Sequence, residues 1–390
     1  MESKVDVAII GAGIAGTSIA YALADRGAKT AIFDKRSFGA GNSGKSSGLV
    51  RHFYSTELAM KMTKLARETW SNFASKIGEP LAFYRNRMVV LPREEMRDGI
   101  EKVAVYMKKN RLKCSFLTRS SLRKALPGSV LDDVSFGFLD AEAGYVSDPL
   151  LAVTTLGRVA QRLGAHYHPF TKVTGIDVAD GRVRGVITDK GRVEANCVVN
   201  AAGSGARELG KVIGIDLPIS SERQQIVVVK PTKKMSATYP TVIDYIKNIY
   251  VRPEISGSVI IGSGERGVPA NPDNFNEGAE NGSVELLMRL GAERFQFLKH
   301  ARILRAYAGL YDVTPDDYPI IGELESVKGF VNACGFSHGF KLGPAVGKVV
   351  SELILDRDYQ SIDLTPLKFE RFERHELIKP FLGKSGGGTG

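Results

Sequence analysis

The glycine-rich turn GAGIAG near the N-terminus constrains the fold more than any other feature of the sequence. It follows an almost wholly apolar run at residues 5–10 and precedes a helical pattern that ends at Gly27. A second strand-like run occupies residues 29–34. Continuous apolar runs are typical of parallel strands buried on both faces, and a right-handed crossover places two such strands in one sheet. The chain is therefore predicted to begin with a βαβ unit.

The glycines of this turn have the spacing G-x-G-x-x-G, formed by Gly11, Gly13 and Gly16. The first makes the tight turn, the second lets a pyrophosphate approach, and the third allows close packing of helix and strand. Free N–H groups at the helix start then face the phosphates. Asp34 ends the second strand, where an acid accepts hydrogen bonds from ribose hydroxyls. A turn that binds nothing, and a merely solvated Asp34, are the alternatives.

The motif alone does not distinguish FAD from NAD, but the segment after Asp34 does. The long Gly/Ser loop KRSFGAGNSGKSSGLVRHFY follows at residues 35–54. A nicotinamide domain usually proceeds soon to another helix and strand, whereas a loop of small residues suits an extended dinucleotide. FAD is therefore favoured.

Strand and helix patterns alternate at both ends of the chain, while the middle is rich in strands. Helices are predicted at residues 150–165 and 344–355, and a last buried strand at 330–333. Several strands joined by turns are predicted within 165–203, with others at 223–230 and 257–264. This order predicts an α/β fold, in which a Rossmann-like, doubly wound nucleotide domain is interrupted by a second domain. The final GKSGGGTG, with 383–390 as a flexible tail, is assigned no function.

Composition excludes several classes of protein. No apolar run reaches the roughly 20 residues that a membrane helix needs, and no signal peptide is evident, so a cytoplasmic protein is expected. The three cysteines are far apart and suggest neither disulfides nor a zinc site, and no metal is expected. The net charge of +10 comes from scattered residues, which favours attraction of small anions over nucleic-acid binding.

Five motifs in order make the chain similar to the D-amino-acid oxidase superfamily of FAD enzymes. They are VAIIGAGIAGTSIAYALADRG, GNSGKSSGLVRHFY, CVVNAAGSGA, TPDDYPIIG and CGFSHGFKLGPAVG. The resemblance covers nearly the whole chain and is greatest to sarcosine oxidase, glycine oxidase, and dimethylglycine and proline dehydrogenases. It implies a glutathione-reductase-type FAD domain with an interleaved substrate domain on a mixed, largely antiparallel sheet. The implied bounds are 1–80, 148–217 and 318–375 for the FAD domain, and 81–147 and 218–317 for the substrate domain.

The resemblance also implies which residues bind FAD. The first glycine loop binds the pyrophosphate, Asp34 the adenosine ribose, and the backbone of Val173 the adenine. The last loop passes beside the flavin pyrimidine, where the following helix N-terminus stabilises negative charge. The full implied set is Gly11, Gly13, Ile14, Ala15, Gly16, Asp34, Lys35, Arg36, Gly41, Asn42, Ser43, Ser46, Ser47, Gly48, Val173, Ala201, Ala202, Gly203, Gly309, Gly335, Ser337, His338, Gly339, Phe340 and Lys341.

Relatives that oxidise small amino acids hold the substrate carboxylate with an arginine and a lysine. By position these are Arg51 and Lys341, and two fixed cations can orient the α-carbon over flavin N5. A surface ion pair and a solvated loop lysine are the respective alternatives. Tyr250 and Tyr311 match pocket tyrosines but could equally be core residues. His52 and His338 are further candidates, although a lone loop histidine is more often structural.

The chain also departs from its relatives. The loop GFSHGFK is one glycine shorter, which affects the reach of Lys341. Gly309 replaces the cysteine that links FAD covalently in some members, so noncovalent FAD is expected. Ile260 replaces a lysine that promotes reaction with oxygen, which favours a dehydrogenase, and Gly264 replaces a pocket histidine, which favours a substrate other than sarcosine.

The expected activity is oxidation of the C–N bond of a small amino or imino acid by hydride transfer to flavin N5. The electron acceptor is oxygen or a redox partner, and the chain could form a homo- or hetero-oligomer. Alternatives are oxidation of a 2-hydroxy acid or glycerol 3-phosphate, a role as flavin subunit of a multi-subunit dehydrogenase, or an RNA-modifying flavoprotein, which only the charge suggests.

Overall fold

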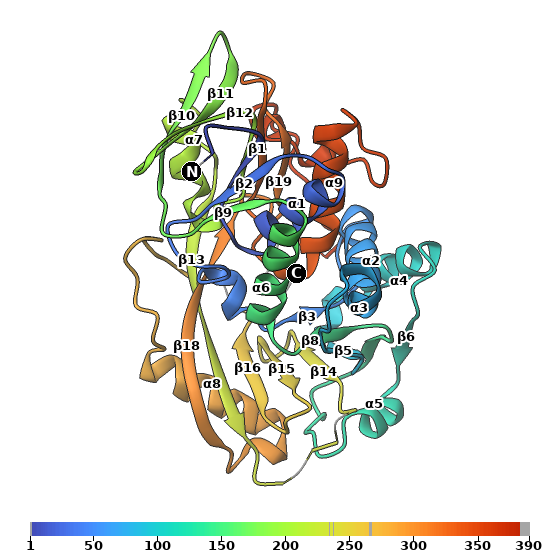
Figure 1. The fold of residues 1–390 in the computed structure, drawn as a ribbon. Coiled ribbons are helices and arrows are strands. Elements are labelled where there is room, and N and C mark those ends of the chain that lie inside the picture. The colour runs from blue at the N-terminus through green and yellow to red at the C-terminus, as the bar shows by residue number, and fades with distance from the viewer. Residues whose placement is uncertain (1, 234, 237, 265–266, 383–390) are drawn as a thin grey trace.

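The chain folds into two large β-sheets with helices packed on them (Figure 1). The computed structural model describes residues 2–233, 235–236, 238–264 and 267–382. The predicted tail at 383–390 lies outside the described residues. Within the described chain, no helix has the length and apolar character needed to cross a bilayer.

The first sheet has eight strands and contains the predicted βαβ unit. Its strand order is β10-β11-β12-β1-β2-β9, with β20 paired to β12 and β19 to β20. β1 is parallel to both β2 and β12, and β12 is parallel to β20, whereas β10, β11 and β19 are antiparallel to their neighbours. The strands are β1 (Lys4–Ile10), β2 (Thr30–Phe33), β9 (His166–His168), β10 (Val173–Ala179), β11 (Arg182–Thr188), β12 (Gly191–Asn200), β19 (Ile320–Glu323) and β20 (Phe330–Cys334).

Helices cover this sheet, and β1 contributes to two separate cores. Val7 and Ile9 pack with residues of α1 and α9, whereas Ala8 and Ile10 pack in the core that includes Ala206 of α7. Alternation of strand side chains between the two faces explains why the whole run is apolar. α1 packs against α6 and α9, and α9 also against α2. The helices are α1 (Ile14–Asp25), α2 (Glu57–Ser71), α3 (Phe73–Ile77), α6 (Pro149–Arg162), α7 (Ala206–Val212), α9 (Gly343–Leu355) and α10 (Glu370–Glu373).

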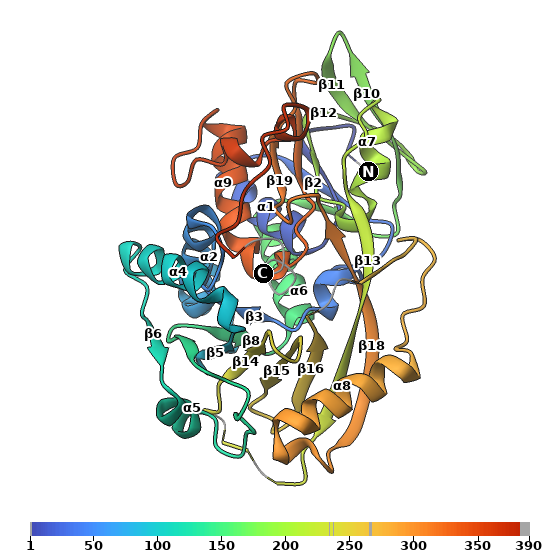
Figure 2. The same ribbon diagram turned by 180° about the vertical axis from the view of Figure 1, so that it is seen from behind.

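The second sheet has nine strands in the order β17-β13-β16-β15-β14-β5-β7-β6, with β18 paired to β13. Among the described residues of this sheet, the β14–β5 pair is parallel and the other pairs are antiparallel. Figure 2 shows the long strands β13 and β18 running side by side toward the first sheet. The strands are β5 (Met88–Leu91), β6 (Cys114–Leu117), β7 (Gly137–Asp140), β13 (Ser220–Lys230), β14 (Thr241–Asp244), β15 (Ile249–Pro253), β16 (Val259–Ser263), β17 (Val268–Pro269) and β18 (Arg302–Val313).

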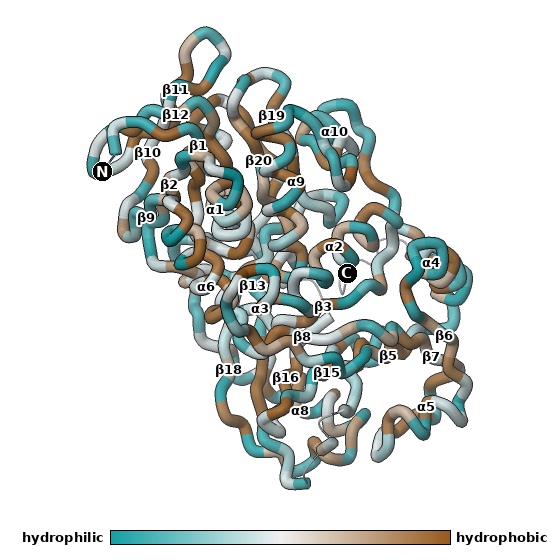
Figure 3. Tube along the Cα trace, turned by 45° about the vertical axis from the view of Figure 1, so that its right-hand side comes forward, coloured by the Kyte–Doolittle hydropathy of each residue, from teal (hydrophilic) through white to brown (hydrophobic). Residues whose placement is uncertain are grey.

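Three short strands and three further α-helices lie outside the two groups described so far. β3 (Leu49–Val50), β8 (Gly144–Val146) and β4 (Phe83–Tyr84) form a small antiparallel sheet. α4 (Arg97–Lys109) and α5 (Arg119–Ala125) contact β6, and α8 (Asn281–Arg294) covers β13, β15 and β16. Hydrophobic segments are concentrated on strands such as β20 and β16 (Figure 3), as expected for elements that supply the cores.

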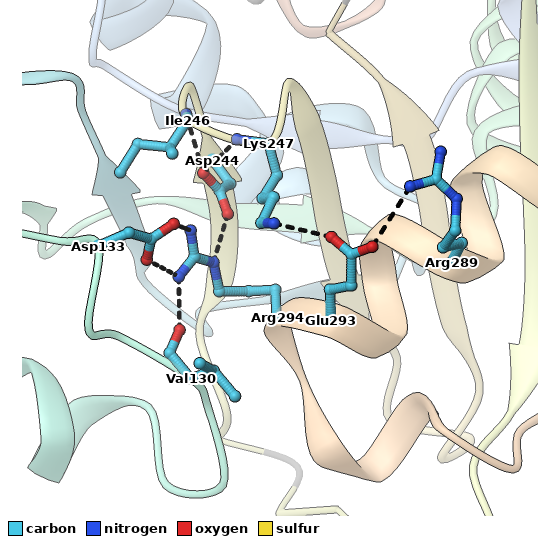
Figure 4. Close-up of polar contacts among 8 residues, drawn as sticks. All are labelled: Val130, Asp133, Asp244, Ile246, Lys247, Arg289, Glu293 and Arg294. Atoms are coloured by element: carbon cyan, nitrogen blue, oxygen red, sulfur yellow. Dashed lines mark hydrogen bonds and ion pairs between the residues drawn. The ribbon is translucent and has the colours of Figure 1, made fainter.

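An ion-pair network fixes the end of α8 to the second sheet (Figure 4). The Arg294 guanidinium, 1% exposed, donates from Nε to Asp244 Oδ2 at 2.6 Å and from Nη1 to Asp133 Oδ1 at 2.6 Å. Hydrogen bonding to Arg294 lowers the pKa of Asp133, whereas burial raises the pKa of Asp244 despite its pairing with Arg294. Removing the arginine would leave a buried carboxylate without its cation, so this contact is structural.

Candidate active site

A large cavity is lined by residues that are far apart in the sequence. They come from the first glycine loop, the Gly/Ser loop, the segment after β12, strands β13, β15 and β18, and the loop between β20 and α9. Most of the predicted residues line it: Gly11, Gly13, Ile14, Ala15, Asp34, Lys35, Arg36, Gly41, Asn42, Ser43, Ser46, Ser47, Arg51, Ala201, Ala202, Gly203, Tyr250, Gly309, Tyr311, Ser337, His338, Gly339, Phe340 and Lys341.

The first glycine loop has no room for side chains. Gly11 has φ +107°, and a Cβ there would lie 2.3 Å from the carbonyl oxygen of Ala201. A Cβ at Gly16 would lie 1.9 Å from the carbonyl oxygen of Gly11, so this glycine serves packing and does not line the cavity. Gly13, at the N-cap of α1, has no side-chain cap. The start of α1 thus offers backbone N–H groups and positive dipole charge to the cavity.

Asp34 turns back toward the glycine loop. Its Oδ2 accepts from the Ala12 N–H at 2.7 Å, and its Oδ1 accepts from the Arg36 N–H at 2.7 Å. Each carboxylate oxygen has a second lone pair, so these bonds orient the group and leave it able to accept from a diol. The Ile14 N–H donates to Ser43 Oγ at 3.0 Å, which fixes the Gly/Ser loop against the start of α1.

Asn42 joins the Gly/Ser loop to two other parts of the cavity. Its Nδ2 donates to Ser204 Oγ at 2.8 Å, and its Oδ1 accepts from the Leu310 N–H at 2.9 Å. Both amide atoms are therefore engaged in bridging the segment after β12 and strand β18. Gly48 does not line the cavity, because it forms a turn with φ +68° against Val146.

An acidic segment between β17 and α8 forms ion pairs with the basic residues of the Gly/Ser loop. We call residues 271–280 the strap. Asp273 pairs with Lys35, and Glu277 pairs with Lys45 at 3.0 Å and with Arg36 at 3.7 Å. Pro272 and Phe275 of the strap line the cavity, and the Lys45 ammonium lies 5.1 Å from the Phe275 ring centroid. The sequence gives no motif for this contact, because it joins solvent-facing charges across more than two hundred residues.

Arg51 and Lys341 meet inside the cavity. Arg51 is 1% exposed and donates from Nη1 to the Phe53 carbonyl at 3.0 Å, and Lys341 is 5% exposed. The guanidinium and the ammonium lie 4.8 and 5.1 Å from the ring centroid of Tyr54. Burial, and then the charge of Arg51, hold the pKa of Lys341 well below its ordinary value. Lys341 is therefore not a solvated loop lysine, and the shorter loop still brings it beside Arg51.

The loop between β20 and α9 is fixed by a buried carboxylate. Asp312 Oδ2 accepts from the N–H groups of Gly335 and Phe336 at 2.9 and 3.1 Å. Gly335 and Ser337 both have positive φ, +70° and +52°. Burial raises the pKa of Asp312 to about 6. Sequence reasoning missed Asp312, although it directly follows the predicted Tyr311.

The rest of this loop is fixed by an aromatic stack. The Trp70 indole donates from Nε1 to the Lys341 carbonyl at 2.8 Å, and its ring stacks on Phe340 at 5.3 Å between centroids. Ser337 Oγ is buried and has no hydrogen-bond partner among the described residues. A buried hydroxyl left without a partner is costly, so this atom fits a polar ligand group such as a flavin carbonyl or amide.

Two tyrosines face the same cavity. Burial raises the pKa of Tyr311 to about 12 and raises that of Tyr250 well above its ordinary value, so both phenols stay protonated at neutral pH. The rings of Tyr311 and His338 lie 4.5 Å apart. The cavity therefore brings together two cations, two phenols and one imidazole.

Three other predicted residues lie elsewhere. His52 is fully buried outside the cavity lining, where its N–H donates to Asp140 Oδ2 at 2.6 Å and its Nδ1 lies 3.4 Å from Asp140 Oδ1. Burial opposes ionisation of Asp140, but the charge and hydrogen bonds of His52 hold its pKa below the ordinary value. Val173 is buried where β10 pairs with β11, and Gly335 is buried and does not line the cavity. The predicted contact of Val173 with adenine stays a prediction.

Comparisons with known proteins show the family to which the chain belongs. Residues 6–353 match the DAO family, described as FAD dependent oxidoreductase. The chain is 26% identical to the sarcosine oxidase subunit beta of Arthrobacter sp over 97% of its length and 93% of the relative's. It is 26% identical to the glycine oxidase of Geobacillus kaustophilus, with 95% and 98% covered.

A solved structure, that of L-proline dehydrogenase from P. horikoshii, superposes with a TM-score of 0.90 at 26% identity and covers 97% of this chain and 100% of that one. These matches confirm the predicted fold class and the predicted kinship. The residues present fit FAD, since a glycine-rich turn, the Asp34 carboxylate and a buried hydroxyl without a partner among the described residues line one cavity. The chain therefore belongs to the DAO family of FAD-dependent oxidoreductases.

Proposed function

We propose that this protein oxidises the C–N bond of an amino or imino acid whose carboxylate is held by Arg51 and Lys341. The observation that carries this proposal is that both cations are buried on one tyrosine ring, in the same cavity as the glycine loop. Within the described residues Lys341 has no acidic partner. A substrate carboxylate would supply the counter-charge that this buried ammonium lacks.

Arg51 and Lys341 would bind the substrate carboxylate in different ways. The guanidinium of Arg51 can donate two parallel N–H bonds to a carboxylate, whereas Lys341 Nζ acts as a point charge. Because burial and Arg51 disfavour the protonated lysine, a bound carboxylate favours it again. A bound carboxylate therefore raises the pKa of Lys341 again and stabilises its ammonium form. The protonated phenols of Tyr250 and Tyr311 can donate to the substrate and help to exclude water.

The remaining lining residues would hold FAD. The start of α1 and Ser43 would face the pyrophosphate, Asp34 the ribose, and Ser337 and the helix start at α9 the pyrimidine edge. When bound, FAD accepts a hydride from the substrate α-carbon. Gly309 lines the cavity where some relatives carry a cysteine, and this supports noncovalent binding. Acid precipitation should then release all of the flavin into the supernatant.

We also propose the domain division and the acceptor. Every strand of the nine-stranded sheet falls within 81–147 or 218–317, which supports their assignment as the substrate domain. Ile260 is buried at the position where a lysine promotes reaction with oxygen in sarcosine oxidase. This supports transfer of electrons to a redox partner, and slow reoxidation of the reduced enzyme by air would agree with it.

Anaerobic mixing of the holoenzyme with a panel of amino acids, followed by flavin absorbance, tests the proposal. Bleaching is expected with at least one amino or imino acid, and the product should be a 2-oxo acid or a cyclic imine. If only a 2-hydroxy acid or glycerol 3-phosphate bleaches the flavin, the proposed activity is wrong. The matched variant Arg51→Met should abolish bleaching at low substrate concentration while retaining the flavin spectrum.

A further inference from the structure

A second cavity adjoins the first at the loop between β20 and α9. Its volume is about 460 Å³, within the range typical of small-molecule sites. Phe336 and His338 line both cavities, and Leu342, which lines the second, directly follows Lys341. The two cavities therefore meet at this loop, beside Lys341, one of the two cations proposed to bind the carboxylate.

Tyr54 connects the second cavity to the cation pair. Its ring lines the cavity and lies beneath both Arg51 and Lys341. The side chain is 9% exposed, and its Oη has no hydrogen-bond partner among the described residues. Burial raises the pKa of Tyr54 to about 12, so this phenol is a permanent donor. A buried donor without an acceptor is costly, so this hydroxyl is suited to an acceptor group on a ligand.

Three other polar side chains of the second cavity are already engaged, and Asp317, His338 and Lys379 also line it. Asp316 accepts from Nε and Nη2 of Arg371 at 2.9 and 3.0 Å, and Ser55 Oγ lies 3.2 Å from the Tyr318 hydroxyl. What remains facing the space is mainly apolar. The apolar side chains include those of Leu58, Met62, Phe336, Leu342, Leu377 and Ile378.

We propose that the second cavity binds the apolar side chain of the substrate, an inference that rests on the proposed function. The carboxylate then lies at Arg51 and Lys341, Tyr54 Oη donates to it, and the hydrocarbon part extends among the apolar side chains. The substrate class is an amino acid with a bulky aliphatic or aromatic side chain. Glycine and sarcosine would leave this space unfilled and lose its contribution to binding.

A series of unreactive carboxylates tests this directly on the holoenzyme. Acetate, butanoate, hexanoate and phenylacetate are titrated, and binding is followed by the change in flavin absorbance. Burial of each methylene is worth about fourfold in Kd, equivalent to about 0.8 kcal/mol. Hexanoate should therefore bind about 200-fold more tightly than acetate. A Kd that does not change along the series would overturn the proposal.

Substitutions that fill the second cavity test whether the gain in carboxylate affinity with chain length arises there. Leu58 is half-buried and lines the cavity, so Leu58→Trp should fill the space and reduce the hexanoate-to-acetate ratio to below about tenfold. Leu65 is half-buried on the same helix but does not line the cavity, so Leu65→Trp should keep the full ratio. If Leu58→Trp does not fold, Leu377→Trp, at a rim position that is 40% exposed, replaces it. Equal ratios in the filling and control variants would refute the location.

The amino-acid panel separates the two proposals. Faster flavin bleaching by leucine or phenylalanine, in one enantiomer, than by glycine, sarcosine or proline supports both. Bleaching by amino acids without any preference for large side chains, and with a flat carboxylate series, refutes the second cavity's role alone. If no amine bleaches the flavin but the carboxylate series still shows its gradient, the proposed activity fails and the binding site stands.

Discussion

Asp312 offers the most quantitative test of how the flavin loop is held. Its carboxylate is 8% exposed and accepts the N–H groups of Gly335 and Phe336. Replacement by asparagine retains an acceptor oxygen of the same shape but removes the titration. The stability of the wild type should therefore depend on pH in a way that Asp312→Asn does not share.

The sign and size of this pH dependence of stability follow from the pKa of Asp312. Burial raises the pKa of Asp312 to about 6, from about 3.9 in an unfolded chain. The folded protein therefore binds more protons than the unfolded chain between these values, and stability falls as pH rises from about 4 to about 6. The full difference is about 3 kcal/mol, and about 2 kcal/mol of it lies between pH 4.5 and pH 8.

Thermal unfolding of the holoenzyme, followed by Trp70 fluorescence, measures this difference. An unfolding entropy of about 2.1 cal/mol/K per residue gives about 0.8 kcal/mol/K for a chain of 390 residues. The wild type should lose about 2 to 3 °C relative to Asp312→Asn between pH 4.5 and pH 8. Other groups titrate equally in both proteins and cancel. Parallel pH profiles for the two proteins would show that Asp312 is ionised normally and that the argument from burial is incorrect.

Three further predictions follow from the other contacts. Lys341→Met should weaken carboxylate binding about 10- to 150-fold, the worth of one charged hydrogen bond, measured by flavin absorbance. An unchanged Kd would show that Lys341 does not contact the carboxylate. The double variant Asp273→Asn with Glu277→Gln should release FAD about 2- to 10-fold faster than the wild type at low salt, measured by free-flavin fluorescence. This difference in rate should vanish near 1 M salt, because exposed charges are then screened. A difference that persists at high salt would contradict ion pairing by the strap. Arg294→Met should lower the melting temperature by about 4 to 6 °C, because breaking a buried ion pair costs roughly 3–5 kcal/mol. The Kd for FAD should not change. A changed Kd would mean that the ion-pair network supports the cofactor site.

The sequence alone predicted those features that depend on local sterics and spacing. Gly11 and Gly16 are required because a Cβ at either position would strike backbone atoms at 2.3 and 1.9 Å. The continuous apolar run of β1 follows from burial on both faces, and the helix ends where Gly27 adopts φ +82°. Such constraints act within a few residues or leave a fixed spacing, so they can be read along the chain.

Only the tertiary structure decided which distant side chains meet. Asp312 and the strap carry no motif, because their partners are backbone N–H groups and charges brought close by folding. His52 follows Arg51 directly, yet the His52 side chain pairs with Asp140 in the core, whereas the Arg51 side chain lines the cavity. The second cavity arises where α2, the loop before α9 and the C-terminal segment converge. Burial and long-range proximity are properties of the packed chain, and no local pattern of residues encodes them.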